Sequence, residues 1–252
     1  DALFAGLQPL DFHVAVLEAV CRAVSYAHAK GVLHRDIKPS NIMLGRFGEV
    51  YVVDWGIAVG LPGSDLPLQQ ADTVITVEGT PAYLSPEMAT ANGAKLGPAS
   101  DIYCLGAVLH EVLTGKCRNQ GQDLQHTLAA AASVKPAQYG RHIPAGLAAV
   151  ANRATARDPD DRFDTAESFR RALREAATFR TSEGLYAQAV TKHIALKHSL
   201  NTETFDLITY TRQAAEVRAL YEQSLALWES NTRARRDLDL FLGEWASLEL
   251  DI

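Results

Sequence analysis

Five polar side chains whose types could perform chemistry stand close together in the stretch LHRDIKPSNIML, which spans residues 33–44. These side chains are His34, Arg35, Asp36, Lys38 and Asn41. Apolar runs flank them on both sides, and burying so polar a loop costs free energy unless its groups bond one another or a ligand. The stretch therefore predicts a site in which these groups serve each other or a bound molecule.

The residues after this loop predict a β-hairpin. Two short apolar runs, 42–44 and 50–53, are separated by Gly-Arg-Phe-Gly at 45–48, which is typical of a hairpin connection. Asn41 precedes the first run and Asp54 follows the second, and these two ends are neighbours in an antiparallel pair. We therefore expect Asn41 and Asp54 to converge.

Asp36 and Lys38 lie in the loop that leads to the same end of the hairpin. The predicted site then holds two carboxylates, an amide oxygen and an ammonium group. Oxygen ligands of this kind suit Mg²⁺, which completes its shell with phosphate and water. A metal held in this way, a carboxylate that receives a proton and a lysine that offsets charge are what phosphoryl transfer requires.

These residues resemble a known family. Residues 34–41 match the pattern HRDxKxxN of the catalytic loop of eukaryotic-type protein kinases, and Asp54-Trp55-Gly56 resembles the DFG motif. The segment GTPAYLSPE at 79–87 is similar to the one that closes the activation loop in that family. The motifs occur in the family's order, and the whole is similar to bacterial serine/threonine kinases.

The resemblance implies catalytic and cofactor-binding roles, with ATP and Mg²⁺ as cofactors and proteins as substrates. Asp36 would be the catalytic base, and Lys38 would contact the γ-phosphate of ATP. Asn41, the third residue of the catalytic set, would hold the metal together with Asp54. Lys38 combined with Thr80, in the substrate-binding loop, matches the serine/threonine pattern rather than the tyrosine pattern.

Further matched residues are implied to be structural. Asp101 fits the buried aspartate that anchors the catalytic loop from below, and Arg162 fits the arginine that pairs with the glutamate of the closing segment, here Glu87. His34 would pack behind the catalytic loop. Arg35 marks the subclass whose activation loop is often ordered by phosphorylation, because a phosphate can pair with that arginine.

Two loop threonines, Thr73 and Thr76, are the candidate phosphorylation sites, and Ser64 is a weaker one. The alternative is that both threonines are unmodified loop residues.

The chain departs from the family in two respects. Trp55 stands where the DFG motif has phenylalanine. The glycine-rich loop, strand lysine and helix glutamate of the family's upper lobe are missing, and no GxGxxG occurs in the sequence. Since the chain also starts at Asp1 rather than Met, we expect a fragment, and we predict that residues 1–252 alone do not turn over ATP at a useful rate.

Around these motifs the sequence predicts a mostly α fold, which would be α+β as a full kinase with its small N-lobe. Residues 1–177 are expected to form a kinase large lobe, helical with a short hairpin, and 178–252 a helical, tetratricopeptide-like tail. The expected helices cover 12–31, 101–115, 145–155 and 165–179, with a long loop at 61–87. In the tail, two helices are expected on either side of a Glu-Ser-Asn connection at 229–231.

Composition narrows the class of protein. The chain has 252 residues, of which 47% are hydrophobic, and a net charge of −6, which argues against nucleic-acid binding. Its cysteines, Cys21, Cys104 and Cys117, show no CxxC spacing, and we interpret them as small buried residues in a reducing compartment. No apolar run is long enough to span a membrane and no signal peptide is recognisable, so the predicted location is the cytoplasm.

Three functions remain open from the sequence. The first is a kinase that is active in its full-length form, with the tail contacting a protein partner. The second is a pseudokinase or scaffold that binds without catalysis. In the third, the tail is the functional part and the lobe is a relic. The complete set of Asp36, Lys38, Asn41 and Asp54 favours the enzyme, because a scaffold has no need for converging carboxylates.

Overall fold

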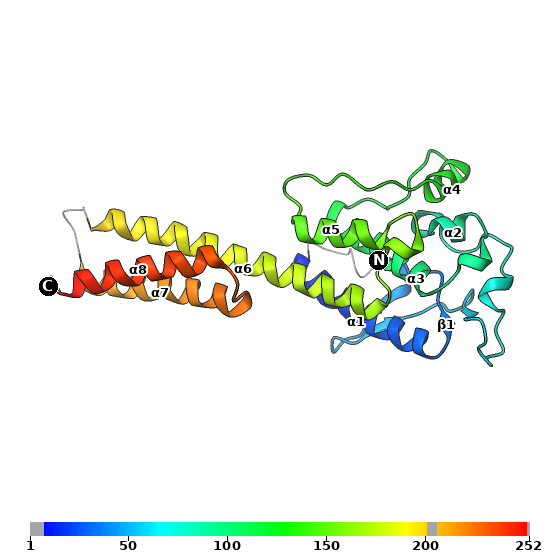
Figure 1. Cartoon of the computed structure of the whole chain (residues 1–252), viewed down its shortest axis with the longest axis horizontal. Coiled ribbons are helices and arrows are strands. Elements are labelled where there is room, and N and C mark those ends of the chain that lie inside the picture. Colours follow the sequence, from blue (N-terminus) through cyan, green and yellow to red (C-terminus); the bar gives the residue numbers. More distant parts are fainter. Residues whose placement is uncertain (1–7, 201–205, 251–252) are drawn as a thin grey trace. The chain divides into compact units, whose positions relative to one another are not determined.

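A computed structural model of the chain describes residues 8–200 and 206–250, with side chains described to residue 247 (Figure 1). The chain divides into two compact units, of which one ends at Ala176 and the other begins at Ala177. We call them the first unit and the second unit. The division falls inside helix α6 (Ala166–Ser199).

Helices are the main regular elements of the first unit. The longer ones before α6 are α1 (Leu10–Ala29), α3 (Pro98–Thr114), α4 (Leu124–Ala132) and α5 (Ala145–Ala154). Helix α3 is the central element, because it is buried from Ser100 to Leu109 and contacts both α1 and α5. Gly106 allows the close approach to α5, since a Cβ atom at this position would lie 2.5 Å from the Cβ of Ala154.

Helix α1 forms where the apolar spacing predicts it. Leu17, Cys21 and Val24 recur at helical intervals and are buried. The helix ends at Ala29, and Gly31 follows with a φ of 75°, a left-handed conformation that glycine adopts without strain. The predicted stop at Gly31 is confirmed, with the helix starting two residues earlier than expected.

The predicted hairpin is confirmed. Strands β2 (Ile42–Leu44) and β3 (Val50–Val52) pair antiparallel, with Ile42 opposite Val52. A second antiparallel pair, β1 (Val32–Leu33) with β4 (Val59–Gly60), was not predicted. Its strands have two residues each, which is too short for an alternating pattern to appear in the sequence.

Short helical turns occupy several connections. They are η1 (Pro39–Asn41), η2 (Ala71–Thr73), η3 (Pro81–Tyr83), α2 (Pro86–Ala89), η4 (Gly93–Lys95) and η5 (Pro159–Asp161). The segment 61–87, predicted as a long loop, is irregular apart from η2, η3 and the start of α2. This irregular segment carries Thr73, Thr76 and Thr80.

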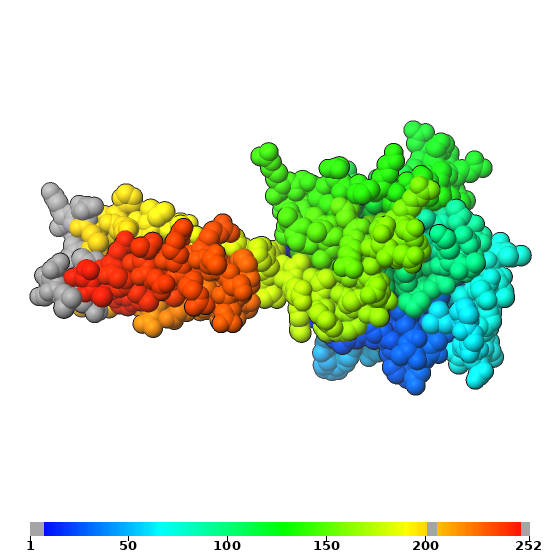
Figure 2. Space-filling view, viewed as in Figure 1, coloured from blue at the N-terminus to red at the C-terminus, as the bar shows by residue number. Residues whose placement is uncertain are grey.

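The second unit consists of the later part of α6 with α7 (Leu207–Leu227) and α8 (Thr232–Leu250). Helix α8, red in Figures 1 and 2, runs beside α7, and the two are joined by the predicted Glu-Ser-Asn connection. The expected helix end at residue 179 is wrong, because α6 continues through Gly184. A single glycine costs a helix only about 1 kcal/mol, which packing offsets.

Apolar and small polar side chains hold the second unit together. Its core includes Leu196, Tyr221 and Phe241. Ser182 and Ser224 are fully buried, and each donates its hydroxyl to the carbonyl of the other, at 2.9 and 3.0 Å. Their small side chains let α6 and α7 approach closely.

The cysteine prediction is confirmed for Cys21 and Cys104, which are buried free thiols, and burial raises the pKa of each. It is wrong in part for Cys117, which is free but only half-buried. None of the helices in the described ranges has the length and apolar composition needed to span a membrane.

Candidate active site

The polar loop 34–41 is anchored from below by α3. Asp101 is fully buried, and its Oδ1 accepts the backbone N–H of Arg35 at 2.8 Å. Its Oδ2 accepts the backbone N–H of His34 at 2.9 Å and pairs with His28 Nε2 at 2.8 Å. Arg35 has a φ of 69°, which is uncommon for a non-glycine residue, and the bonds to Asp101 hold this conformation.

The Asp101 carboxylate is charged in this buried position. Burial by itself would raise its pKa, but the hydrogen bond and charge of His28, followed by the backbone N–H groups of His34 and Arg35, outweigh burial. The pKa of Asp101 is therefore lowered. A buried carboxylate with several donors is a rigid anchor, because each donor loses its partner if the group moves.

Asp36 lies at the centre of a hydrogen-bond network. Its Oδ2 accepts Lys38 Nζ at 2.6 Å and Asn41 Nδ2 at 3.1 Å. Its Oδ1 accepts both the backbone N–H and the hydroxyl of Thr80, at 3.0 and 2.7 Å. Lys38 Nζ also donates to Thr80 Oγ1 at 2.7 Å. The fold thus brings together four of the predicted site residues: Asp36, Lys38, Asn41 and Thr80.

Gly79 lets the chain bring Thr80 to this network. It has a φ of 110°, and a Cβ atom here would lie 2.9 Å from Leu84 Cδ2 and 3.1 Å from the carbonyl oxygen of Arg35. Both the backbone angle and the space therefore exclude a larger residue. The requirement explains the glycine that precedes Thr80.

His34 connects the loop to the end of the hairpin. It is fully buried, and its Nδ1 accepts the backbone N–H of Asp36 at 3.1 Å. Its Nε2 therefore carries the proton and donates to the carbonyl of Val53 at 3.1 Å. The ring of Trp55, the departure from the DFG motif, lies 4.4 Å from the ring of His34, and its Nε1 donates to the carbonyl of Val52. The larger indole is thus accommodated against the histidine.

Asp54 stays outside the Asp36 network. It is exposed, has a φ of 62°, and its carboxylate receives no hydrogen bond from the residues that the structure describes. Its backbone does approach Asn41, because the neighbouring Val53 N–H donates to the carbonyl of Asn41 at 2.9 Å. The expected convergence is thus seen in the backbone, whereas no hydrogen bond joins the two side chains within the described part of the chain.

The donor set at this place fits Mg²⁺. The amide nitrogen of Asn41 is used by Asp36, so its Oδ1 is the atom left open, and no described residue donates to it. The Asp54 carboxylate is open as well. Two oxygen ligands are a small set, but Mg²⁺ usually takes one or two protein ligands and completes its shell with phosphate and water. The described residues contain no cluster of three or more His, Cys, Asp or Glu that would favour another metal.

Arg35 points toward the loop that carries the candidate phosphorylation sites. The side chain is 1% exposed, and its Nη1 donates to Glu78 Oε2 at 3.2 Å and to the carbonyl of Ile57. Glu78 was not predicted as a partner of Arg35, although its acidic side chain directly before Gly79 and Thr80 could have suggested such a pair. Thr73 donates its hydroxyl to the carbonyl of Gln70, and neither it nor the exposed Thr76 contacts Arg35.

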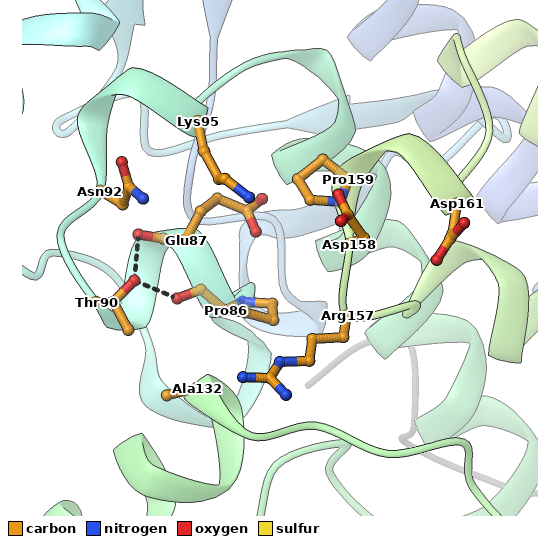
Figure 3. Close-up of a pocket in the computed structure, with 10 residues that line it drawn as sticks. All are labelled: Pro86, Glu87, Thr90, Asn92, Lys95, Ala132, Arg157, Asp158, Pro159 and Asp161. Atoms are coloured by element: carbon orange, nitrogen blue, oxygen red, sulfur yellow. Dashed lines mark hydrogen bonds between the residues drawn. The ribbon is translucent and has the colours of Figure 1, made fainter.

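Glu87 and Arg162 form the buried pair that the resemblance implied. Two parallel bonds of 2.7 and 2.9 Å join them, and both side chains are at most 1% exposed. The remaining N–H groups of Arg162 donate to carbonyls of Ala99, Ala156 and Arg157, so all five donors are used. Figure 3 shows Glu87, which lies on α2. The backbone carbonyl of Glu87 accepts a hydrogen bond from the hydroxyl of Thr90.

Arg162 decides the charge of Glu87. Burial would raise the pKa of this carboxyl, but the hydrogen bonds and charge of Arg162, with the hydroxyl of Ser100, lower it overall. Ser100 donates to Glu87 Oε1 at 2.7 Å and was not predicted, because a serine directly before the expected helix 101–115 also fits a simple N-cap.

Comparison with known proteins identifies the family of this chain. Residues 11–172 match the model of the protein kinase domain. This match covers more than half of the chain, and the chain therefore belongs to the protein kinase domain family. The helices α7 and α8 lie outside the matched residues.

Individual relatives are bacterial serine/threonine-protein kinases. The chain is 35% identical over 178 residues to PknD of Chlamydia trachomatis, an alignment that covers 63% of this chain and 19% of the relative. It is 36% identical over 165 residues to PknB of Mycobacterium tuberculosis, which covers 64% of this chain and 25% of the relative. The matched stretch is thus about a fifth to a quarter of these proteins.

Proposed function

We propose that this chain is the large-lobe part of a bacterial serine/threonine protein kinase, which transfers the γ-phosphate of ATP to serine or threonine hydroxyls of proteins. The observation that carries the proposal is the network that joins Asp36 to Lys38, Asn41 and Thr80. Its place within the kinase match at 11–172 supports it. We assign residues 1–177 to the kinase lobe and 178–252 to a tetratricopeptide-like region.

Asp36 is the proposed base for the attacking hydroxyl. Its two oxygens accept four hydrogen bonds, which fix the orientation of the carboxylate. A carboxylate offers about four lone-pair positions, so an incoming hydroxyl must replace one of these donors. The Thr80 hydroxyl is the one that can leave, because the Thr80 backbone N–H keeps its own bond to Asp36 Oδ1.

The neighbouring residues would hold the nucleotide. Asn41 Oδ1 and the Asp54 carboxylate would bind Mg²⁺, which neutralises charge on the ATP phosphates when it is present. Lys38 Nζ, already 2.6 Å from Asp36 Oδ2, would offset the charge of the transferred group. His34, Arg35, Asp101 and the Glu87–Arg162 pair would position the loop without touching substrate.

The phosphate-covering elements of the family are not among these residues, since the sequence has no GxGxxG loop. We propose that they come from outside these 252 residues. The chain taken alone would then not turn over ATP at a useful rate. Robust phosphorylation of a generic substrate by purified 1–252 would contradict this.

Phosphorylation of Thr73 or Thr76 remains a proposal for control of the loop. Glu78 already supplies a negative charge to Arg35. A phosphate on Thr76, which precedes Glu78 by two residues, would compete with that carboxylate for the guanidinium group. Peptide mapping of the autophosphorylated protein by mass spectrometry would identify the modified residue.

The test of the kinase function is autophosphorylation of the full gene product that contains this chain, with Mg-ATP. The Asp36→Asn variant should lose about 100-fold or more in rate, because a general base contributes about 10²–10⁴-fold. Asp65→Asn, on an exposed loop, is the matched control and should keep full activity. Thermal unfolding of each variant separates loss of chemistry from loss of fold.

Two outcomes would count against the enzyme. Equal rates in the parent and the Asp36→Asn variant would exclude Asp36 as the catalytic base. An inactive, folded parent whose upstream region lacks the glycine loop and lysine would favour the pseudokinase or scaffold.

The region 178–252 is proposed to bind another protein. It keeps large apolar side chains in solvent, such as Ile208 at 81% and Leu240 at 56% exposure. We propose that it binds a protein partner. Comparing the proteins captured by the full gene product with and without this region tests the idea.

A further inference from the structure

A polar pocket of the first unit lies beside the segment that carries Thr80. Its volume is about 500 Å³, and its wall is formed by the end of α3, the α3–α4 connection and the residues that follow α4. Three cations line it: Lys116, Arg118 and Lys135. No aspartate or glutamate of the described chain lines this pocket.

The positive charge of the pocket is not neutralised. Arg118 is held by neutral acceptors, because its Nε donates to Thr155 Oγ1 at 3.1 Å and its Nη2 to the carbonyl of Lys135 at 2.6 Å. Within the described residues, no carboxylate pairs with Lys116 or Lys135, and both lysines are exposed. The nearby Glu111 does not line the pocket, and its Oε2 accepts the hydroxyl of Tyr83.

His110, which also lines the pocket, does not change its positive charge. Burial, followed by the positive charge of Arg118, lowers the pKa of His110 to about 4. His110 is therefore uncharged at neutral pH, and the three cations alone set the sign of the pocket. An anionic group is the ligand that would meet matching charge here.

One wall residue connects the pocket to the proposed substrate loop. Asn119 is 2% exposed, and its Nδ2 donates to the carbonyls of Pro81 and Leu84, at 3.2 and 2.9 Å. Its backbone N–H donates to the carbonyl of Ala82 at 3.1 Å. The segment that follows Thr80 is thus fixed directly against the cationic pocket.

The pocket near Glu87 gives a contrast within the same unit. It has nearly the same volume, about 510 Å³, but both signs of charge line it. Figure 3 shows Lys95 and Arg157 there together with Asp158 and Asp161. Such a wall does not select one sign of charge, so it serves as an internal control.

Resting on the proposed kinase function, we propose that the pocket of Lys116, Arg118 and Lys135 binds an anionic side chain of the protein substrate, a carboxylate or a phosphate group. The substrate chain would present its hydroxyl to Asp36 at Thr80 and its anionic residue to this pocket. The kinase would therefore prefer acidic or previously phosphorylated substrates.

Peptide binding tests this without catalysis. The probes are fluorescein-labelled peptides in which one serine is followed by a run of glutamates, by glutamines, or by a phosphoserine among glutamines. Fluorescence anisotropy with the full gene product, without ATP, measures their affinities. The acidic and phosphorylated peptides should bind more tightly than the glutamine peptide, and more weakly as salt rises.

The variants locate the binding. Lys116→Gln combined with Lys135→Gln should weaken the anionic peptides about 5-fold and leave the glutamine peptide unchanged. Lys95→Gln combined with Arg157→Gln, which removes the same charge from the mixed pocket, should leave all three unchanged. If the phosphorylated peptide loses more affinity than the acidic one, the pocket binds a phosphate group. If the acidic peptide loses more, the pocket binds a carboxylate.

Failure of this inference is distinguishable from failure of the kinase function. Equal affinity for acidic and glutamine peptides, or equal losses in both double variants, overturns the anionic pocket even when the enzyme is active. A catalytically silent protein that loses anionic-peptide binding only in the Lys116/Lys135 variant supports the pocket and overturns the kinase instead.

Discussion

The two units bury different kinds of polar group. In the first unit four charged side chains are at most 3% exposed: Arg35, Glu87, Asp101 and Arg162. In the second unit the buried polar residues within the described ranges are Ser182, Ser224 and Asn231, all uncharged. A buried charge is costly unless it is paired and hydrogen-bonded, whereas a buried hydroxyl needs one neutral partner.

Buried polar groups therefore serve different purposes in the two units: they position loops in the first unit and pack helices in the second. Each buried charge of the first unit bonds the polar loop 34–41, the irregular segment 61–87 or a residue that holds one of them. The buried hydroxyls of the second unit join α6 to α7 and replace apolar contact with small, mutually satisfied groups. The comparison predicts that substitutions should cost most where charge is buried.

The largest expected effect is that of Arg162→Ala. It leaves the carboxylate of Glu87 buried without its partner, and such a loss costs about 3–5 kcal/mol of unfolding free energy. Urea unfolding of the full chain, with hydrogen exchange in α3 as the reporter of the first unit, measures this cost.

Arg233→Ala is its control in the second unit. Arg233 pairs with Glu183 but is 57% exposed, so its loss should cost less than about 1 kcal/mol. If the two substitutions cost the same, the contrast between the units is wrong.

An intermediate effect is expected for Asp101→Asn. The amide oxygen can still accept from Arg35, but the NH₂ group would face the N–H of His34, and an unmet buried donor costs about 1–3 kcal/mol. The loss should appear as a lower midpoint of urea unfolding at neutral pH.

A comparison of wild type with Asp101→Asn at different pH values tests the charge of Asp101. Its pKa is lowered in the folded chain, so the unfolded chain takes up the proton first as the pH falls below about 4. The stability from this carboxylate is full above that pH and is lost as the pH falls through the folded pKa. The gap between wild type and Asp101→Asn should therefore narrow in acid; a constant gap would rule out the charge as its source.

The smallest effect is expected at the serine pair. Ser182→Ala or Ser224→Ala should each cost about 1 kcal/mol, because each removes one buried hydrogen bond from a hydroxyl to the carbonyl of the other residue. The two hydroxyl oxygens also lie 3.1 Å from each other, so the double variant should cost less than the sum of the single ones. Hydrogen exchange in α7 measures the change, and strictly additive costs would show that the hydroxyls act independently.

Much of the candidate site was predictable because its information is local. The loop 34–41 and the hairpin that follows lie within about twenty residues, and alternation, turn residues and motif spacing all act over that range. The structure confirms the hairpin and joins Asp36, Lys38 and Asn41. Helix α1 and the α7–α8 pair were predicted for the same reason, from a repeating apolar pattern.

Only the tertiary structure could decide the contacts between distant segments. Arg35 meets Glu78 across 43 residues, and Asn119 meets Leu84 across 35, although neither pairing leaves a periodic trace in the sequence. The cationic pocket likewise gathers residues from both sides of α4. Residue types and spacing therefore determined the chemistry of the loop, whereas helix packing determined which charges meet, because burial makes an unpaired charge too costly to leave in place.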